Sequence, residues 1–152
     1  MPKFEYEDEI NRAPDTVWAI VSNPNTWPQW FPEIESVSNF TGLQQGGTFQ
    51  YQHGGVTGHG QITALRGGGD TRELEVVTEV NNNRSVNWFR VGAKHGLLGG
   101  GGGKAWLNYH MEYNSAVPIV GNFISGGNPF DQKRLHNAVE KVKQLAESGY
   151  VG

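Results

Sequence analysis

The sequence predicts an α+β fold in which a curved antiparallel sheet of about seven strands wraps on one long C-terminal helix. An apolar stripe with helical spacing runs through residues 129–148. Between residues 34 and 113, short runs of alternating apolar and polar residues are separated by glycine-rich or asparagine-rich turns. Strands joined by short turns pair antiparallel, and a curved sheet of this kind can bury its apolar face against a single helix.

The composition indicates a single domain spanning residues 1–152 with a substantial core. The chain has 5 Trp, 5 Tyr and 7 Phe, and its 22 glycines are about twice the usual share of roughly 7%. A net charge of −3 without a basic run disfavours nucleic acid as a partner, and the absence of Cys excludes thiolate chemistry. No apolar run reaches the roughly 18 residues of a membrane helix and the N-terminus is acidic, so we expect a cytoplasmic protein without membrane insertion.

The N-terminal part of the chain predicts one strand followed by two short helices. Residues 3–10 alternate strictly, which is typical of a strand with one face in water. Pro14 with Asp15 beside it opens a helix, and Pro24 ends it. A second helical turn follows in residues 25–32, where tryptophans and prolines indicate a rigid corner at one end of the core.

The middle of the chain predicts a succession of strands in hairpins. The segment that contains Gly58 and Gly60 is the least regular of them, and glycine inside a strand often marks a bend or a bulge. The predicted strands are 34–40, 48–53, 56–65, 72–80, 85–91 and 104–113.

The last predicted helix spans residues 129–148 and is about 30 Å long. Proline suits its first position, and Gly149 can end it. Because two residues of its apolar stripe are alanines, the stripe indicates either close packing on the sheet or a gap beneath the helix. The stripe consists of Leu135, Ala138, Val139, Val142, Leu145 and Ala146.

Two segments fall outside this pattern of strands and helices. Residues 92–104 contain Leu97-Leu98 followed by a run of five glycines, and this segment is either a flap that touches a ligand or partner, or a hairpin tip without a role. Residues 114–127 contain little charge, and we expect them to pack at the mouth of the space that the last helix covers.

The order of elements, together with residues 10–21 (INRAPDTVWAIV) and 23–32 (NPNTWPQWFP), resembles the START-like superfamily, also called SRPBCC. Within it, the chain is most similar to the bacterial polyketide cyclase/dehydrase and lipid transport group. The resemblance implies a helix-grip fold with a cavity between the sheet and the last helix. It also implies a hydrophobic or amphipathic ligand such as a lipid, sterol or polyketide. Some members are cyclases or aromatases, and others bind and carry.

No complete catalytic motif is present, so we assign no catalytic residue. The sequence contains no Gly-x-Ser-x-Gly elbow, no phosphate loop and no dinucleotide-binding fingerprint. We expect no cofactor and no metal. His53 and His59 flank a glycine turn, so they either face each other across a hairpin or are separate strand-end residues.

The expected function is binding, with transport or sequestration, of a small hydrophobic or amphipathic ligand between the sheet and the C-terminal helix. The alternative is a cyclase or dehydratase that uses Tyr, His or Arg groups at the cavity wall as acids and bases. A third possibility is an interaction module, for which Trp106 and the Leu97-Leu98 segment are the only support. The predicted ligand-binding residues are Phe49, Tyr51, His53, Trp88, Arg90, Tyr109, Met111, Ala138 and Val142.

Overall fold

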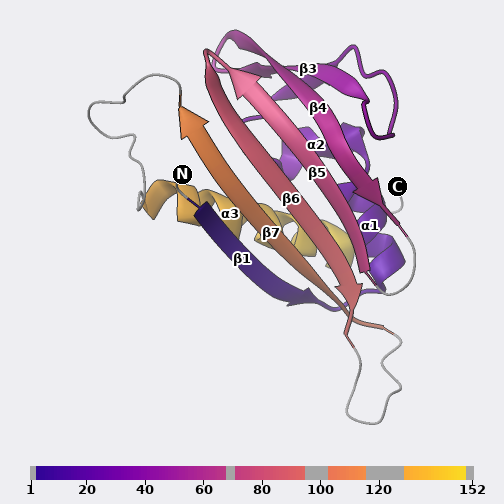
Figure 1. Ribbon diagram of the computed structural model, residues 1–152. Coiled ribbons are helices and arrows are strands. Elements are labelled where there is room, and N and C mark those ends of the chain that lie inside the picture. Colours follow the sequence, from indigo (N-terminus) through magenta and orange to yellow (C-terminus); the bar gives the residue numbers. More distant parts are fainter. Residues whose placement is uncertain (1–2, 68–70, 95–102, 116–128, 150–152) are drawn as a thin grey trace.

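The computed structural model describes residues 3–67, 71–94, 103–115 and 129–149. One seven-stranded antiparallel sheet, in the order β1-β7-β6-β5-β4-β3-β2, covers one side of the helices (Figure 1). This confirms the predicted fold class and the predicted order of elements. The strands are β1 (Lys3–Ile10), β2 (Ser36–Ser38), β3 (Thr48–His53), β4 (Val56–Arg66), β5 (Thr71–Val80), β6 (Asn83–Ala93) and β7 (Ala105–Ser115). The helices are α1 (Pro14–Val21), the 3-10 turn η1 (Pro24–Thr26), α2 (Trp27–Trp30) and α3 (Pro129–Glu147).

The long helix α3 crosses behind the sheet in Figure 1 and lies closest to β1, β7, α1 and α2. Its predicted stripe is confirmed, because five of the six residues are buried and Leu145 is partly buried against the core. Gly149 follows the helix with a φ of 89°, a left-handed conformation that suits glycine at this position. No helix within the described ranges is long and apolar enough to cross a lipid bilayer.

The half of the sheet farther from α3 is covered by aromatic side chains from the corner formed by η1 and α2. Trp27 lies 5.1 Å from Phe49, and Trp30 lies 5.2 Å from Phe89, measured between ring centroids. Phe31 also contacts Phe89 at 5.2 Å. The predicted role of residues 25–32 as a rigid plug of the core is therefore confirmed.

Two aromatic rings lie directly on glycine residues of the neighbouring strand. Phe49 pairs with Gly60, and Tyr51 pairs with Gly58 across the β3–β4 hairpin. A Cβ atom on Gly60 would stand 2.1 Å from the Phe49 ring, and one on Gly58 would stand 2.4 Å from the Tyr51 ring. The glycines of β4 therefore make room for rings that pack flat against the strand.

Polar contacts join the edge strand β1 to α3. Lys143 Nζ lies 3.1 Å from Asp8 Oδ2, and the Tyr6 hydroxyl donates to Glu140 Oε2 at 3.5 Å. At the end of the strand, the Asn11 backbone N–H donates to Glu147 Oε2 at 2.9 Å. Asp8 is on the inner face, as its place in the alternation predicts, and it is partly exposed beside the helix.

Three predicted segments differ from the structure or lie outside the described residues. The strand predicted at 34–40 is reduced to β2, because the backbone turns into the left-handed region at Asn39, with φ 52°. Most of the glycine-rich segment 92–104 and nearly all of the connector 114–127 lie outside the described residues.

Replacing Gly60 by Ala should lower the free energy of unfolding by about 2 kcal/mol, because the new methyl group would overlap the Phe49 ring. Urea denaturation measures this change. Gly67→Ala is the matched control, since a Cβ there would meet no atom within 4 Å, and it should stay within about 0.5 kcal/mol of the wild type. Equal effects of the two substitutions would contradict the proposed ring-on-glycine packing.

Replacing Glu140 by Gln should stabilise the protein at neutral pH and not at acidic pH. The hydrogen bond between Glu140 and Asp8, followed by burial, raises the pKa of Glu140 from its usual 4.5. Burial alone would raise the pKa of Asp8, but hydrogen bonds with Glu140 and Lys143 lower it. A raised carboxyl pKa means that the folded state prefers protonated Glu140, so its favourable contribution is lost as the pH rises through the folded-state pKa.

The expected gain from Glu140→Gln at pH 7 is about 0.5 kcal/mol, because solvent screens this partly exposed pair. Below the usual pKa of 4.5 the gain should vanish, since Glu140 is then protonated in both states. Thermal unfolding at several pH values measures it, with the exposed Glu79→Gln on the outer face as the control. A stabilisation by Glu140→Gln that increases as the pH falls would contradict this prediction.

Candidate functional site

The buried polar residues of the sheet gather on its inner face, the face toward the helices. Thr78 on β5 and Ser85 and Asn87 on β6 are each at most 5% exposed, and Tyr51 and Tyr109 bring their phenol rings to the same face. Strand register places Thr78 opposite Ser85, and Asn87 lies in the neighbouring row. We call these five residues the polar island, because apolar core residues surround them.

The Tyr109 hydroxyl has its hydrogen bond within the island. It donates to Asn87 Oδ1 at 2.6 Å, and Asn87 Nδ2 in turn donates to the Val76 carbonyl at 3.1 Å and to Thr78 Oγ1 at 3.5 Å. The side chain of Asn87 is 2% exposed, so each of these groups has a protein partner in place of water. This part of the island is fully connected.

The Tyr51 hydroxyl is the exception. The residue is 0% exposed, and its hydroxyl makes no hydrogen bond within the described part of the chain. The Thr78 hydroxyl is close enough to affect the pKa of Tyr51, but the pair lacks the geometry of a hydrogen bond. A buried hydroxyl left without a partner costs about 1–3 kcal/mol, and a water molecule or a ligand can supply that partner.

Glu33 affects the pKa of both tyrosines of the polar island. It follows α2 with a φ of 74°, which is uncommon for a residue with a side chain, and its side chain is 19% exposed. Burial, and then the charge of Glu33, raises the pKa of both Tyr51 and Tyr109. Arg134 NH1 of α3 lies 3.4 Å from Glu33 Oε1 and holds this carboxylate at the rim.

The structure brings seven of the nine predicted ligand-binding residues to the inner side. Tyr51 and Tyr109 belong to the polar island, and His53 continues the inner face of β3, where its buried Nδ1 also lacks a partner among the described residues. His59 faces the outer side, so the two histidines do not meet across the hairpin. The remaining inner residues are Phe49, Met111, Ala138 and Val142.

Trp88 and Arg90 lie on the outer face, contrary to the expectation that they line the interior. Trp88 Nε1 donates to Glu75 Oε2 at 2.5 Å, and its ring contacts His110 at 5.0 Å. Arg90 Nε is 3.8 Å from Glu73 Oε2. The prediction failed because β6 carries a large aromatic residue on each face, so its alternation does not show which face is buried.

The sequence analysis missed Glu33, Thr78, Ser85 and Asn87. A polar residue at an inner position of an alternating strand was the available signal for Thr78, which follows Leu74 and Val76 in the same phase. No local sequence signal indicates that Glu33 raises the pKa of Tyr51 on β3 and of Tyr109 on β7, because this influence depends on the tertiary structure.

An open groove of about 260 Å³ lies between the α2 corner and α3. Its walls include Trp30, Phe31 and Ala138, and the Glu33–Arg134 ion pair lies at its edge. Ala138 is 2% exposed and forms part of the wall of this groove.

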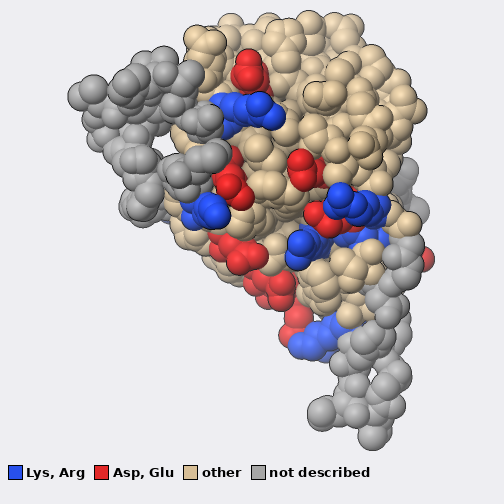
Figure 2. Space-filling model, viewed as in Figure 1, with Lys and Arg blue, Asp and Glu red and all other residues tan. Residues whose placement is uncertain are grey.

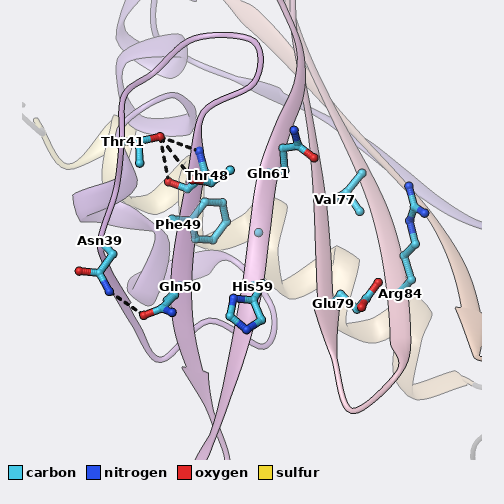
Figure 3. Close-up of a pocket in the computed structure, with 11 residues that line it drawn as sticks. Asn39, Thr41, Thr48, Phe49, Gln50, His59, Gln61, Val77, Glu79 and Arg84 are labelled. Carbon is cyan, nitrogen blue, oxygen red and sulfur yellow. Dashed lines mark hydrogen bonds between the residues drawn. The ribbon is translucent and has the colours of Figure 1, made fainter.

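Two further grooves lie on the outer face. One of about 560 Å³ is lined by polar side chains of the β3–β6 strands, including Gln50, His59 and Arg84, and Asn39 Nδ2 donates to Gln50 Oε1 at 2.6 Å (Figure 3). The other, of about 250 Å³, surrounds Trp88 and His110. Acidic and basic side chains alternate over this face in Figure 2, and Glu73 is shared by Arg66 and Arg90.

No three His, Asp or Glu side chains gather closely enough to hold a metal ion within residues 3–67, 71–94, 103–115 and 129–149. The inner face instead offers hydrogen-bonding groups inside an apolar shell. Such an arrangement can orient a mostly apolar molecule by one polar group.

The chain was compared with known families and structures. A family model described as polyketide cyclase / dehydrase and lipid transport matches residues 1–147. A search of curated proteins found no match.

Several solved structures are similar in fold. A hypothetical protein from Helicobacter pylori has a TM-score of 0.74 at 9% identity, over 95% of this chain and 87% of that one. Norcoclaurine synthase from Thalictrum flavum, in complex with dopamine and hydroxybenzaldehyde, has a TM-score of 0.62 at 14% identity, over 99% and 88%. A START superfamily protein from Mycobacterium smegmatis has a TM-score of 0.56 at 16% identity, over 96% and 94%. These similarities confirm the helix-grip fold.

Removing the two island phenol oxygens should have opposite effects on stability. Tyr109→Phe leaves Asn87 Oδ1 buried without a donor and should lower the free energy of unfolding by about 1–3 kcal/mol. Tyr51→Phe removes an unpartnered hydroxyl and should leave the ligand-free protein equally or more stable. Urea denaturation of the delipidated variants measures both. A similar loss in the two variants would mean that the Tyr51 hydroxyl has a partner in the free protein.

Proposed function

The chain belongs to the polyketide cyclase/dehydrase and lipid transport family, and from this premise we propose that it binds a small hydrophobic or amphipathic ligand between the sheet and α3. The proposal is that the protein holds or carries this ligand without converting it. The observation that carries it is a pair of buried polar atoms on the inner face of β3, Tyr51 Oη and His53 Nδ1, which have no hydrogen-bond partner among the described residues. A protein interior that is complete without a guest satisfies almost all such atoms itself.

The apolar surroundings of these atoms support the same proposal. Phe49 and Met111 are buried on the same inner face of the sheet, and Val142 is buried on α3, all at most 5% exposed. A ligand in these surroundings would gain most of its binding free energy from apolar contact and its orientation from a few polar groups. Release and uptake would proceed through the groove beside Ala138, where the Glu33–Arg134 pair is the polar boundary.

A second function, that of a cyclase or dehydratase, is favoured by one observation. The charge of Glu33 raises the pKa of both Tyr51 and Tyr109. In this function Tyr51 would be the proton donor and Glu33 the base. Loss of one water molecule from a bound hydroxyketone, followed by mass spectrometry, tests it. Recovery of unchanged compound after prolonged incubation, alongside saturable binding, favours the binding protein.

Filling the interior should abolish binding. Wild-type protein is expected to bind Nile red, a neutral apolar dye, in a saturable manner with increased fluorescence. Ser85→Leu places a larger side chain on the inner face of β6 and should lower the affinity at least about tenfold, since the added side chain would occupy space that the dye needs. Val86→Leu, the next residue on the outer face of the same strand, is the matched control and should bind like the wild type.

Both variants must unfold cooperatively for this comparison, which circular dichroism during heating establishes. The proposal fails if wild-type protein shows only weak, non-saturable uptake of Nile red. It also fails if Ser85→Leu and Val86→Leu bind the dye equally well, because the dye then lies elsewhere.

A further inference from the structure

The larger of the two grooves on the outer face has a volume of about 560 Å³ and crosses strands β3–β6 (Figure 3). We call it the outer groove. Strand register places its side chains in two rows that run across the strands, and at a strand spacing of about 4.8 Å the first row is about 19 Å long. The first row consists of Asn39, Gln50, His59, Glu79 and Arg84, and the second of Thr41, Thr48, Gln61 and Val77.

The wall of the outer groove next to β3 is fixed by backbone hydrogen bonds. The Thr48 backbone N–H donates to Thr41 Oγ1 at 2.8 Å, and the Gly46 N–H donates to the Ile62 carbonyl at 2.7 Å. Directly after Ile62, a bulge shifts the register of β4 against β5, and bulges of this kind redirect side chains beside binding sites. The shape of this wall therefore does not depend on flexible side chains.

The part of the outer face that β3 and β4 form carries no Lys, Arg, Asp or Glu. Glu and Arg side chains occupy the outer face of the neighbouring strands β5 and β6 (Figure 2). On β3 and β4 every outward position has instead a hydroxyl, an amide or an imidazole group. These positions are Thr48, Gln50, Gln52, Thr57, His59 and Gln61.

Most hydrogen-bonding groups in the outer groove are not used by the protein. Asn39 Nδ2 donates to Gln50 Oε1 at 2.6 Å, which leaves the oxygen of Asn39 and the nitrogen of Gln50 for other partners. The side chains of His59, Gln61 and Arg84 make no hydrogen bond or ion pair within the described part of the chain. The groove therefore offers both donors and acceptors to a molecule that enters it.

The same lining disfavours apolar and charged ligands. Of the described residues that line the groove, only Val77 brings an apolar side chain to it, because Phe49 is 2% exposed with its ring on the inner face. Arg84 lies opposite Glu79 in the strand register, so an anion beside the guanidinium would also lie beside a carboxylate.

A peptide that adds to a sheet needs a free strand edge, and the outer groove has none on β3 or β4. Each of these strands pairs with a neighbour on both sides. A molecule rich in hydroxyl groups fits the lining better, because a hydroxyl both donates and accepts, as the amide and hydroxyl side chains of the groove do.

We propose that the outer groove binds a short, linear, uncharged saccharide, whose hydroxyl groups bond to Asn39, Gln50 and Gln61. The saccharide lies across the strands, along the first row of side chains. This site is on the opposite face of the sheet from the proposed hydrophobic ligand, so the inference goes beyond the proposed function and does not depend on it.

Titration of isotope-labelled protein with cellotriose, followed in two-dimensional proton–nitrogen NMR spectra, tests the inference. The side-chain amide signals of Asn39, Gln50 and Gln61 should move in a saturable manner, with a dissociation constant of about 1–10 mM, the range expected of a few exposed hydrogen bonds. Trigalacturonate, which is anionic, and tetraethylene glycol dimethyl ether, which has no hydroxyl group, should each bind at least about tenfold more weakly.

Two variants assign the binding to the groove. Gln61→Met removes a donor and an acceptor at similar side-chain length and should weaken the binding of cellotriose about threefold to tenfold. Gln52→Met is the matched control, because Gln52 is also an outward glutamine but does not line the groove, and its Nε2 donates to Thr57 Oγ1 at 3.0 Å. This control should bind cellotriose like the wild type, and the spectra of both variants show whether they are folded.

The outcomes separate this inference from the proposed function. The inference is overturned if cellotriose moves no signal of the groove, if trigalacturonate or the ether binds as tightly, or if the two variants bind equally. Nile red should bind with unchanged affinity in the presence of cellotriose, and displacement of the dye would mean that both share one site, which also overturns the inference. Protein that binds cellotriose but not Nile red would support the inference and refute the proposed function.

Discussion

The contact between an aromatic ring and a glycine on the next strand determines how the β3–β4 hairpin packs. Phe49 and Tyr51 lie so close to Gly60 and Gly58 that no side chain fits beneath them. Since glycine presents only its backbone, both rings lie flat on β4 and the sheet can bend over them. Trp106 repeats the contact on Gly92 at the other face. Some of the many glycines are thus required within strands, because an aromatic ring packs directly on them.

The chemistry of the interior follows from this packing. A Tyr51 ring that lies along β4 carries its hydroxyl toward the middle strands, where Thr78 and Asn87 are also buried. Hydrogen bonds in such an apolar shell are strong, and unmade ones are correspondingly unfavourable. The connected half of the island, around Asn87, therefore stabilises the fold, whereas the Tyr51 hydroxyl has no hydrogen bond within the described part of the chain.

The parts predicted correctly from the sequence are those in which one periodicity dominates. The strict alternation of β1 and the single stripe of α3 leave only one way to bury each element. On β6 the sequence is ambiguous, because Trp88 and Phe89 are both large and face opposite sides. The influence of Glu33 could not be predicted. It depends on a left-handed backbone conformation at Glu33 and on the tertiary structure, because Glu33 and Tyr109 are far apart in the sequence.

An unpartnered phenol at the centre of a core is unfavourable for folding alone. Phenylalanine would fill the same volume over Gly58 and would avoid the cost of a buried, unbonded hydroxyl, which is about 1–3 kcal/mol. That amount is a large share of a typical net stability of about 5–15 kcal/mol. Residues that lower the stability of a fold in this way are concentrated at functional sites, where a ligand or substrate binds. The proposed ligand would therefore give the hydroxyl of Tyr51 a role that folding alone does not require.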